Sequence, residues 1–318
     1  MRLITIDDIR AAADRIGDKA VHTPLLRQVW DGRELWLKPE NLQPVGAFKV
    51  RGAVNALAAL DETTRARGVV SYSSGNHAQA VAYAARQFDV PATIVVQEGA
   101  PEVKVAATKA YGAQVVEAPM AERSAVAHRL AERLDRVIIA PFDHADVIAG
   151  QGTVGLEIAE DLPDVRTVLV PVSGGGLASG VGVAITTLCP NARVIGVEPE
   201  LAGDTAESLR AGRLVRWDPA DRARTIADGL RAEPSQLTFA HLRATLDGVV
   251  TVTEDEIRQA MRVLATRAKL VAEPSGAVST AAWLFHQHEL PAGPTVAIVS
   301  GGNVDARLLA EVLTEQTQ

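Results

Sequence analysis

One lysine, Lys49, has neighbours that suggest chemistry. It lies in residues 46–52 (Gly-Ala-Phe-Lys-Val-Arg-Gly), between apolar side chains and bracketing glycines. Burial disfavours the charged ammonium, so a lysine in such a place keeps a free amine that acts as nucleophile or base. Enzymes that form Schiff bases need this property. Most lysines are solvated surface residues, however, so this segment alone favours the ordinary interpretation.

Two polar turns that follow apolar runs supply further candidate side chains. Residues 73–77 (Ser-Ser-Gly-Asn-His) follow the run 69–72 and precede a helical stretch. Backbone N–H groups at a helix start hold anions, although Ser and Asn also serve there as ordinary caps. Residues 300–303 (Ser-Gly-Gly-Asn) end a late apolar run, and the Ser300 hydroxyl either caps the next helix or bonds a ring nitrogen. The residues themselves leave both choices open.

A run of three glycines marks a third turn. Gly174, Gly175 and Gly176 lie between the apolar run 167–172 and a helical stretch that begins at Leu177. Without side chains the backbone wraps closely around an oxyanion, with the helix dipole behind it. The segment lacks the Gly-Lys-Ser/Thr of a nucleotide P-loop, and no G-x-G-x-x-G fingerprint opens the first strand–helix unit. It predicts a cradle for a single phosphate, with a purely structural glycine run as the alternative.

These segments need a scaffold that brings strand ends together. Short β-rich runs alternate with alanine-rich helical stretches along nearly the whole chain. Strands are predicted at 69–72, 92–96, 114–117, 167–172, 193–197, 248–252 and 295–300, and helices at 77–88, 103–111, 122–134, 177–188, 254–268 and 304–314. This alternation indicates an α/β fold with parallel sheets flanked by helices. Ligands in such folds bind outside the carboxyl ends of the strands, where the three turns lie.

Composition limits the classes of function. The chain has 318 residues, 47% of them hydrophobic and 22% charged, with a net charge of −7, as in soluble globular proteins. Without a long Lys/Arg run, nucleic acid and anionic membranes are poor partners. Thr5 and Asp8 resemble a helix capping box rather than a signal peptide, and no apolar run reaches membrane-spanning length, so we expect a cytoplasmic protein. The single cysteine, Cys189, excludes an intrachain disulfide, and we expect it partly buried near a helix end.

The candidates together match the needs of one cofactor. Pyridoxal phosphate requires an amine, a phosphate cradle, a partner for its ring nitrogen and an anion site for the substrate carboxylate. Lys38-Pro-Glu-Asn41 followed by residues 46–52 resembles a cofactor-attachment signature. Over nearly its whole length, the chain resembles the serine/threonine dehydratases and serine racemases, which are fold type II (tryptophan synthase β-like) pyridoxal-phosphate enzymes.

The resemblance implies a role for each candidate at the cofactor. Lys49 would form the Schiff base, Asn76 would bond the 3-hydroxyl, and Ser300 would face the pyridine nitrogen, leaving the ring unprotonated. The phosphate would be held by the backbone of Gly174, Gly175, Gly176 and Leu177. Many relatives have a fourth glycine where this chain has Ser173, which leaves the contribution of that serine open. Glu273 would lie near the ring without a catalytic role.

The resemblance also implies a substrate loop and a metal site. The substrate carboxylate would be clasped by Ser73, Ser74, Gly75, Asn76 and His77. Glu198, Asp204 and the carbonyl of Ala202 resemble the divalent-cation site of the racemase/dehydratase subgroup, and such oxygen ligands suit Mg²⁺ or Ca²⁺. The alternative is an ordinary acidic turn at a helix start.

The implied architecture is two open, twisted, mostly parallel sheets in two domains. The large domain would comprise residues 1–67 and 144–318, and the small mobile domain, residues 68–143, would close over the substrate. We expect a homodimer. Because the chain ends soon after residue 303, we expect no C-terminal regulatory domain like that of biosynthetic threonine dehydratases.

The implied reaction is β-elimination, in which L-threonine gives 2-oxobutanoate and L-serine gives pyruvate, each with ammonia. Racemisation is a rival that needs a second acid/base, for which Ser74 is the candidate, while the apolar Phe142 favours elimination. β-Replacement of the cysteine-synthase type is disfavoured by His77, where those enzymes usually have Thr. A non-catalytic metabolite-binding protein is disfavoured by the presence of both Lys49 and the glycine run. Relatives also act on 3-hydroxyaspartate, and the substrate stays open among these hydroxy amino acids.

Overall fold

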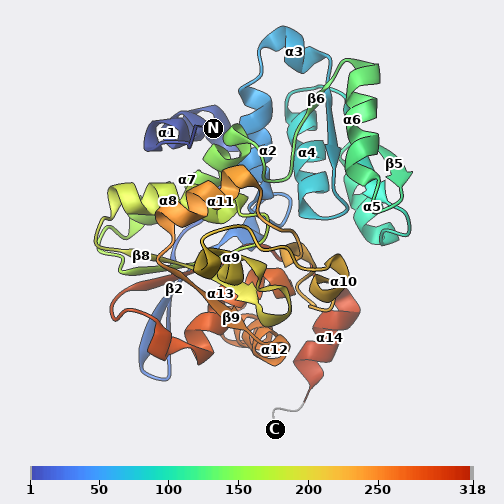
Figure 1. Cartoon of the computed structure of the whole chain (residues 1–318). Helices are drawn as coiled ribbons and strands as arrows, with labels where there is room; N and C mark the ends of the chain where they lie inside the picture. The colour runs from blue at the N-terminus through green and yellow to red at the C-terminus, as the bar shows by residue number, and fades with distance from the viewer. Residues whose placement is uncertain (1, 316–318) are drawn as a thin grey trace.

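The computed structural model describes residues 2–315, which form two open sheets flanked by helices (Figure 1). The larger sheet has the strand order β1-β2-β10-β7-β8-β9 and the smaller one the order β5-β4-β3-β6. All neighbouring strands are parallel except the hairpin pair β1 and β2. The strands are β1 (Leu26–Trp30), β2 (Arg33–Pro39), β3 (Val69–Tyr72), β4 (Ala92–Gln97), β5 (Gln114–Ala118), β6 (Val137–Ile138), β7 (Thr167–Pro171), β8 (Arg193–Pro199), β9 (Gly248–Val252) and β10 (Thr295–Val299). The predicted α/β architecture with two mostly parallel sheets is confirmed.

Helices lie on both faces of the sheets. They are α1 (Ile6–Ile16), α2 (Lys49–Ala58), α3 (Glu62–Ala66), α4 (Asn76–Gln87), α5 (Glu102–Ala110), α6 (Arg123–Leu134), α7 (Ala145–Asp161), α8 (Gly176–Leu188), α9 (Asp204–Ala211), α10 (Pro219–Arg222), α11 (Gln236–Thr245), α12 (Glu254–Val263), α13 (Pro274–Phe285) and α14 (Ala306–Thr314). The six helices predicted from sequence are present, and the long one at 254–268 is α12 followed by a π-helical turn. The capping box of Thr5 and Asp8 opens α1, as predicted. Cys189 lies at a helix end, as predicted, where it is the C-cap of α8, and it is buried rather than partly buried.

Several elements were not predicted, each for a physical reason. Helices α7 and α13 are buried along most of their length, so they lack the polar face that produces an amphipathic pattern. The β1–β2 hairpin turns at Asp31 and Gly32, both with positive φ. An Asp-Gly pair between two short apolar runs is a strong hairpin signal, so the sequence did contain the information for this hairpin.

Two helices beside the glycine run, α7 and α8, pack closely against each other. Helices α7 and α8 approach so closely that a Cβ on Gly180 would lie 2.3 Å from the carbonyl oxygen of Ile148. A Cβ on Gly155 would lie 2.9 Å from that of Ala184. Since α8 begins with Gly176, this packing fixes the position of the predicted phosphate cradle.

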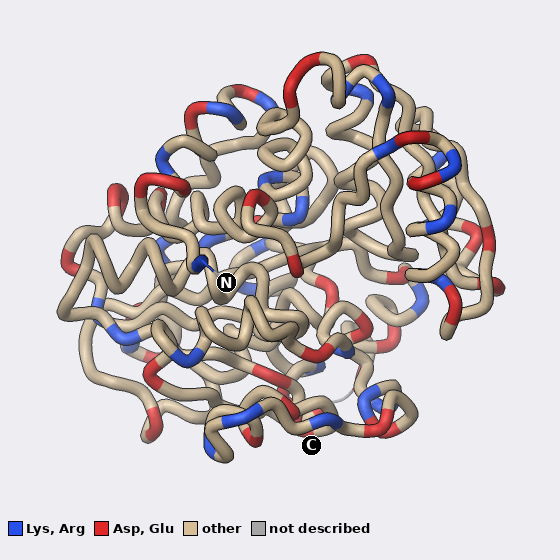
Figure 2. The backbone as a smooth tube through the Cα atoms, turned by 45° about the horizontal axis from the view of Figure 1, so that its top comes forward, with Lys and Arg blue, Asp and Glu red and all other residues tan. Residues whose placement is uncertain are grey.

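Charged residues are distributed without a dominant sign on one side. In Figure 2, acidic and basic residues are interspersed along the outer segments of the tube. Among the described residues, no helix is both long enough and apolar enough to span a bilayer.

Candidate active site

Segments far apart in sequence pair beside Lys49. Ala47 forms an isolated antiparallel bridge with Gly301, and the Phe48 N–H donates to the carbonyl of Ser300 at 3.1 Å. The Gly302 N–H donates to the carbonyl of Gly46 at 2.9 Å. The predicted lysine segment and the predicted 300–303 turn therefore lie side by side, at the carboxyl end of β10.

Lys49 is the first residue of α2, and its amine has little access to water. The Nζ atom donates to the carbonyl of Pro141 at 2.8 Å and lies 5.0 Å from the centre of the Phe48 ring. Part of the side chain keeps some exposed surface, but protein surrounds the amine, and this burial lowers its pKa to about 8. The amine thus loses its proton far more readily than that of a solvated lysine.

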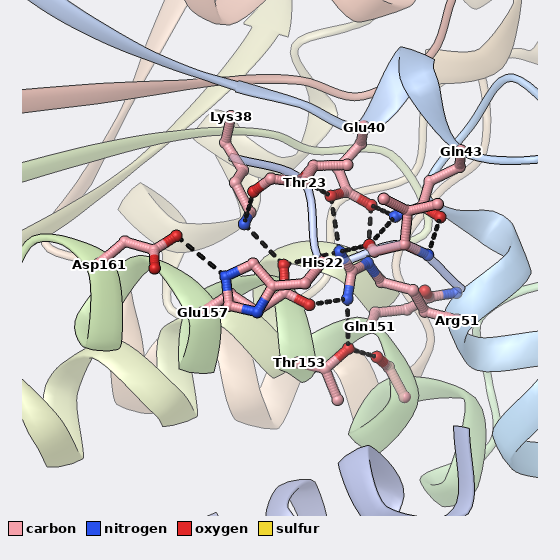
Figure 3. Close-up of polar contacts among 12 residues, drawn as sticks. His22, Thr23, Lys38, Glu40, Gln43, Arg51, Gln151, Thr153, Glu157 and Asp161 are labelled. Atoms are coloured by element: carbon pink, nitrogen blue, oxygen red, sulfur yellow. Dashed lines mark hydrogen bonds and ion pairs between the residues drawn. The ribbon is translucent and has the colours of Figure 1, made fainter. Parts of the chain in front are cut away.

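A buried network of ion pairs fixes the helix that begins with Lys49 (Figure 3). Arg51, only 2% exposed, forks between two carboxylates, with contacts of 2.7 and 2.8 Å to Glu40 and of 2.6 and 2.8 Å to Glu157. Lys38 Nζ donates to Glu157 at 2.6 Å, and the Thr23 hydroxyl donates to Glu40 at 2.6 Å. Burial raises the pKa of Glu40, but the charge and hydrogen bonds of Arg51 outweigh this and hold it below its usual range. Two cations thus balance two carboxylates.

This network was missed by the sequence interpretation, which quoted Lys38, Glu40 and Arg51 only as parts of a signature. The available signal was the density of charge in an otherwise apolar segment. Its partner Glu157 lies on α7, and nothing local in the sequence connects that residue with the signature.

The glycine run offers free backbone donors at the start of α8. A Cβ on Gly174 would lie 2.3 Å from the Phe142 ring, and Gly175 has a φ of +86°. No side chain among the described residues caps α8, so its first N–H groups remain available for an anion. Pro141 accepts the bond from Lys49, and the next residue, Phe142, packs on Gly174, so the amine and the cradle are close neighbours. These residues fit a phosphate group near the amine.

Ser173 has a different task from the glycines that follow it. Its hydroxyl donates to the carbonyl of Ala232 at 3.3 Å and accepts from the N–H of Ala232 at 3.0 Å. The serine side chain therefore fastens the glycine run to the segment that precedes α11.

Ser300 and Asn76 both lie where the lysine segment meets the 300–303 turn. The Ser300 side chain is 4% exposed, and its hydroxyl donates weakly, at 3.3 Å, to the carbonyl of Ser275. Helix α14 begins later and is capped by Asp305, so Ser300 does not cap it. Asn76 opens α4 and bonds the buried Glu273 at 2.6 Å. Burial, followed by the charge of Asp228, raises the pKa of Glu273 to about 7.

Three side chains of the predicted substrate loop form hydrogen bonds with backbone groups. The Ser73 hydroxyl accepts from the N–H of Gly75 at 3.3 Å, and the Ser74 hydroxyl accepts from that of Gln97 at 3.0 Å. No side chain among the described residues caps α4, which leaves its N-terminus open to a carboxylate. His77 Nε2 donates to the carbonyl of Ile139 at 3.0 Å. Burial and the charge of Lys49 lower the pKa of His77 to about 3, so its ring is neutral and offers a carboxylate no ion pair.

The predicted metal ligands Glu198 and Asp204 lie near the end of β8 and at the start of α9. Glu198 is 1% exposed and accepts the N–H groups of Thr205 and Ala206 at 3.1 and 2.9 Å. Burial, with the charge of Asp204, raises the pKa of Glu198 to about 8, and burial raises that of Asp204 to about 7. The buried Oδ2 of Asp204 has no hydrogen-bond partner among the described residues. Two desolvated carboxylates, one with an oxygen free of hydrogen bonds, have the ligand chemistry that a hard cation prefers. The described residues contain no cluster of three His, Cys, Asp or Glu side chains arranged for a metal.

Comparisons with known proteins identify the family of the chain. The family model described as pyridoxal-phosphate dependent enzyme matches residues 18–301. The L-threonine ammonia-lyase of Thermotoga maritima is 43% identical over 321 residues, which cover 98% of this chain and 79% of that protein. The L-threo-3-hydroxyaspartate ammonia-lyase of Saccharomyces cerevisiae is 40% identical over 317 residues, 98% of this chain and 96% of that protein. The solved structure of maize serine racemase superposes with a TM-score of 0.92 at 39% identity, covering 98% of this chain and 97% of that one. The chain therefore belongs to the family of pyridoxal-phosphate-dependent enzymes.

Proposed function

We propose that this enzyme catalyses β-elimination on a small hydroxy amino acid. L-Threonine would give 2-oxobutanoate and ammonia, and L-serine would give pyruvate and ammonia. The observation that carries the proposal is the Lys49 amine, which is surrounded by protein, has a pKa lowered to about 8, and bonds the carbonyl of Pro141, whose neighbour Phe142 packs on the glycine run.

The residues divide the work between binding and proton transfer. When bound, pyridoxal phosphate supplies an aldehyde that condenses with amines and a ring that withdraws electrons from the substrate Cα. Gly174, Gly175, Gly176 and Leu177 would hold its phosphate, Asn76 its 3-hydroxyl and Ser300 its ring nitrogen. The start of α4 would hold the substrate carboxylate, where its N–H groups are uncapped by described side chains. The free Lys49 Nζ would take the Cα proton. The β-hydroxyl would leave with a proton as water, and hydrolysis would consume one water, so that the products are the 2-oxo acid and ammonia.

The names of the relatives support this class of reaction and leave the substrate open. They act, by name, on threonine and on threo-3-hydroxyaspartate, and others are serine racemases. Racemisation is thus the second candidate, and Ser74 is its acid/base. The Ser74 hydroxyl accepts the N–H of Gln97 and keeps its own proton for donation, which is what that role requires.

Three further proposals accompany the reaction. A divalent cation, Mg²⁺ or Ca²⁺, would bind Glu198, Asp204 and the carbonyl of Ala202. Residues 68–143 would form a small domain that moves against residues 1–67 and 144–318. The ion pair of Lys104 and Asp228, 2.7 Å long, crosses between these two parts in the present arrangement. The enzyme would be a cytoplasmic homodimer.

A substrate panel tests the proposal. The purified enzyme, loaded with pyridoxal phosphate, is given L-threonine, L-serine and L-threo-3-hydroxyaspartate, and 2-oxo acid, ammonia and product chirality are measured. We expect 2-oxo acid and ammonia in equal amounts, and none from Lys49→Ala. Lys109→Ala, at an exposed lysine of α5, is the matched control and should keep full activity. D-Serine without pyruvate would favour racemisation, and unchanged 2-oxo acid release by Lys49→Ala would overturn the proposed role of the amine.

A further inference from the structure

A chain of side-chain hydrogen bonds runs through Asn76 and has a fixed direction. It begins at the backbone carbonyl of Val45, which can only accept. Asn303 Nδ2 donates to this carbonyl at 2.8 Å and also to Asn76 Oδ1 at 2.8 Å. Asn76 Nδ2 then donates to Glu273 Oε1 at 2.6 Å. The backbone carbonyl thus determines the orientation of the Asn303 amide, and the Asn303 amide determines that of Asn76.

Two glycines make room for this chain. Gly46 has a φ of +71°, and a Cβ on it would lie 2.5 Å from Asn303 Oδ1. A Cβ on Gly301 would lie 2.2 Å from Glu273 Oε1. Since both distances are far below van der Waals contact, a side chain at either glycine would displace a member of the chain. The lysine segment and the 300–303 turn are therefore both shaped around it.

The donor and acceptor inventory of Asn76 shows what remains for a ligand. An amide has two N–H donors and two oxygen lone pairs. Glu273 uses one N–H, and Asn303 uses one lone pair of the oxygen. The second N–H on Nδ2 has no partner among the bonds of this chain, so on this side Asn76 offers a donor.

We propose that Asn303 is a positioning residue that holds the Asn76 amide with its nitrogen toward Glu273, so that Asn76 presents an N–H to the bound cofactor. This inference rests on the proposed role of Asn76 at the cofactor's 3-hydroxyl. An N–H there stabilises negative charge on that oxygen, whereas a carbonyl oxygen would repel it. Glu273 serves as acceptor in either protonation state, because a neutral carboxyl keeps its carbonyl lone pairs. The direction of the chain therefore does not depend on the charge of Glu273.

The test removes the donor at Asn303, which sets the direction of the hydrogen-bond chain. Asn303→Asp keeps the size of the side chain but replaces the Nδ2 donor with an oxygen that cannot donate to Val45 or Asn76. The readouts are the dissociation constant of pyridoxal phosphate and the visible absorption of the bound cofactor. We expect the dissociation constant to rise at least about tenfold, the effect of losing one hydrogen bond to a charged group, and the absorption band to shift. Asn191→Asp makes the same chemical change at an exposed site and should leave both unchanged.

A second variant separates positioning from stability. In Asn303→Asp combined with Glu273→Gln, Asn76 can donate to the new carboxylate at position 303 and accept from the new amide at position 273. The side chains at positions 303, 76 and 273 are then again joined by hydrogen bonds, but in the opposite direction. We expect thermal stability to recover relative to Asn303→Asp, while weak cofactor binding and the shifted band remain. Recovery of all three would overturn the inference, because it would show that the orientation of Asn76 has no effect on the cofactor.

Asn76→Ala distinguishes this inference from the proposal on which it rests. If Asn76→Ala binds the cofactor with unchanged affinity and absorption, the proposed role of Asn76 is wrong and the inference falls with it. If Asn76→Ala changes both and Asn303→Asp changes neither, only the role of Asn303 is refuted. Changes in both variants, without recovery of the spectrum in the double variant, support the inference.

Discussion

Removing Arg51 tests whether the buried ion network stabilises the fold around Lys49. Arg51→Met keeps most of the length of the side chain and removes its charge and its donors. Arg51 makes hydrogen bonds to Glu40, Glu157, Thr153 and the carbonyl of Val21, and all of them are lost. Lys38 then remains as the single cation of the network beside two carboxylates.

The size of the effect follows from burial. Glu40 is 0% exposed and would keep only the neutral donors of Thr23 and Gln43, at 2.6 and 3.1 Å. Removing one partner of a buried pair leaves an uncompensated charge and costs about 3–5 kcal/mol. The exposed pair of Arg27 and Glu34 has a similarly short distance, 2.6 Å, but solvent screens it, so Arg27→Met should lower the free energy of unfolding far less than Arg51→Met.

Urea unfolding, followed by tryptophan fluorescence and without added cofactor, measures both variants. We expect the free energy of unfolding to fall by about 3–5 kcal/mol in Arg51→Met. The double variant Arg51→Met with Glu40→Gln should lose less than the sum of the two single variants, because the remaining pair of Lys38 and Glu157 is again neutral. A loss in Arg51→Met no larger than that in Arg27→Met would refute this reasoning.

Three further predictions concern pH and ions. The rate at which pyridoxal phosphate attaches to the apoprotein should rise through about pH 8, because burial lowers the pKa of Lys49 to about 8 and only the neutral amine reacts; a rate still climbing toward pH 10 would contradict this. Mg²⁺ or Ca²⁺ should raise the melting temperature, because a cation concentration of a hundred times the dissociation constant adds about 2.7 kcal/mol to the free energy of unfolding. Asp204→Asn should abolish this response, and an equal response in the variant would show that Asp204 is not a ligand. His241 accepts the N–H of Ile4 at 2.9 Å, and burial lowers its folded-state pKa below 6.5, so stability that is present above pH 6.5 should be lost as the pH falls below that value. In acid unfolding, His241→Gln should therefore lessen the dependence of the free energy of unfolding on pH. The control His288→Gln, at an exposed histidine, should leave this dependence unchanged.

The sequence determined the local elements and several ingredients of the site. Apolar runs specified β3, β4, β7 and β8 because strands covered on both faces are apolar throughout. The glycines of residues 174–176 predicted an open turn before α8, since glycine alone permits such close backbone approach. The apolar neighbours of Lys49 made it a candidate for desolvation, and the other polar and glycine-rich turns turned that candidate into part of a predicted cofactor site. Each of these features depends on residues within one turn or strand.

Contacts between segments distant in the sequence determine which of these ingredients meet. The Lys49 amine bonds the carbonyl of Pro141, and Arg51 pairs with Glu157 on a helix much later in the chain. Asn303, in the 300–303 turn, donates to the amide oxygen of Asn76 at the start of α4. Such partners depend on the order of strands in the sheets and on helix packing, which arise from the summed burial of many side chains. A local sequence pattern predicts which residues become buried. The topology of the fold determines which atoms contact those residues once they are buried.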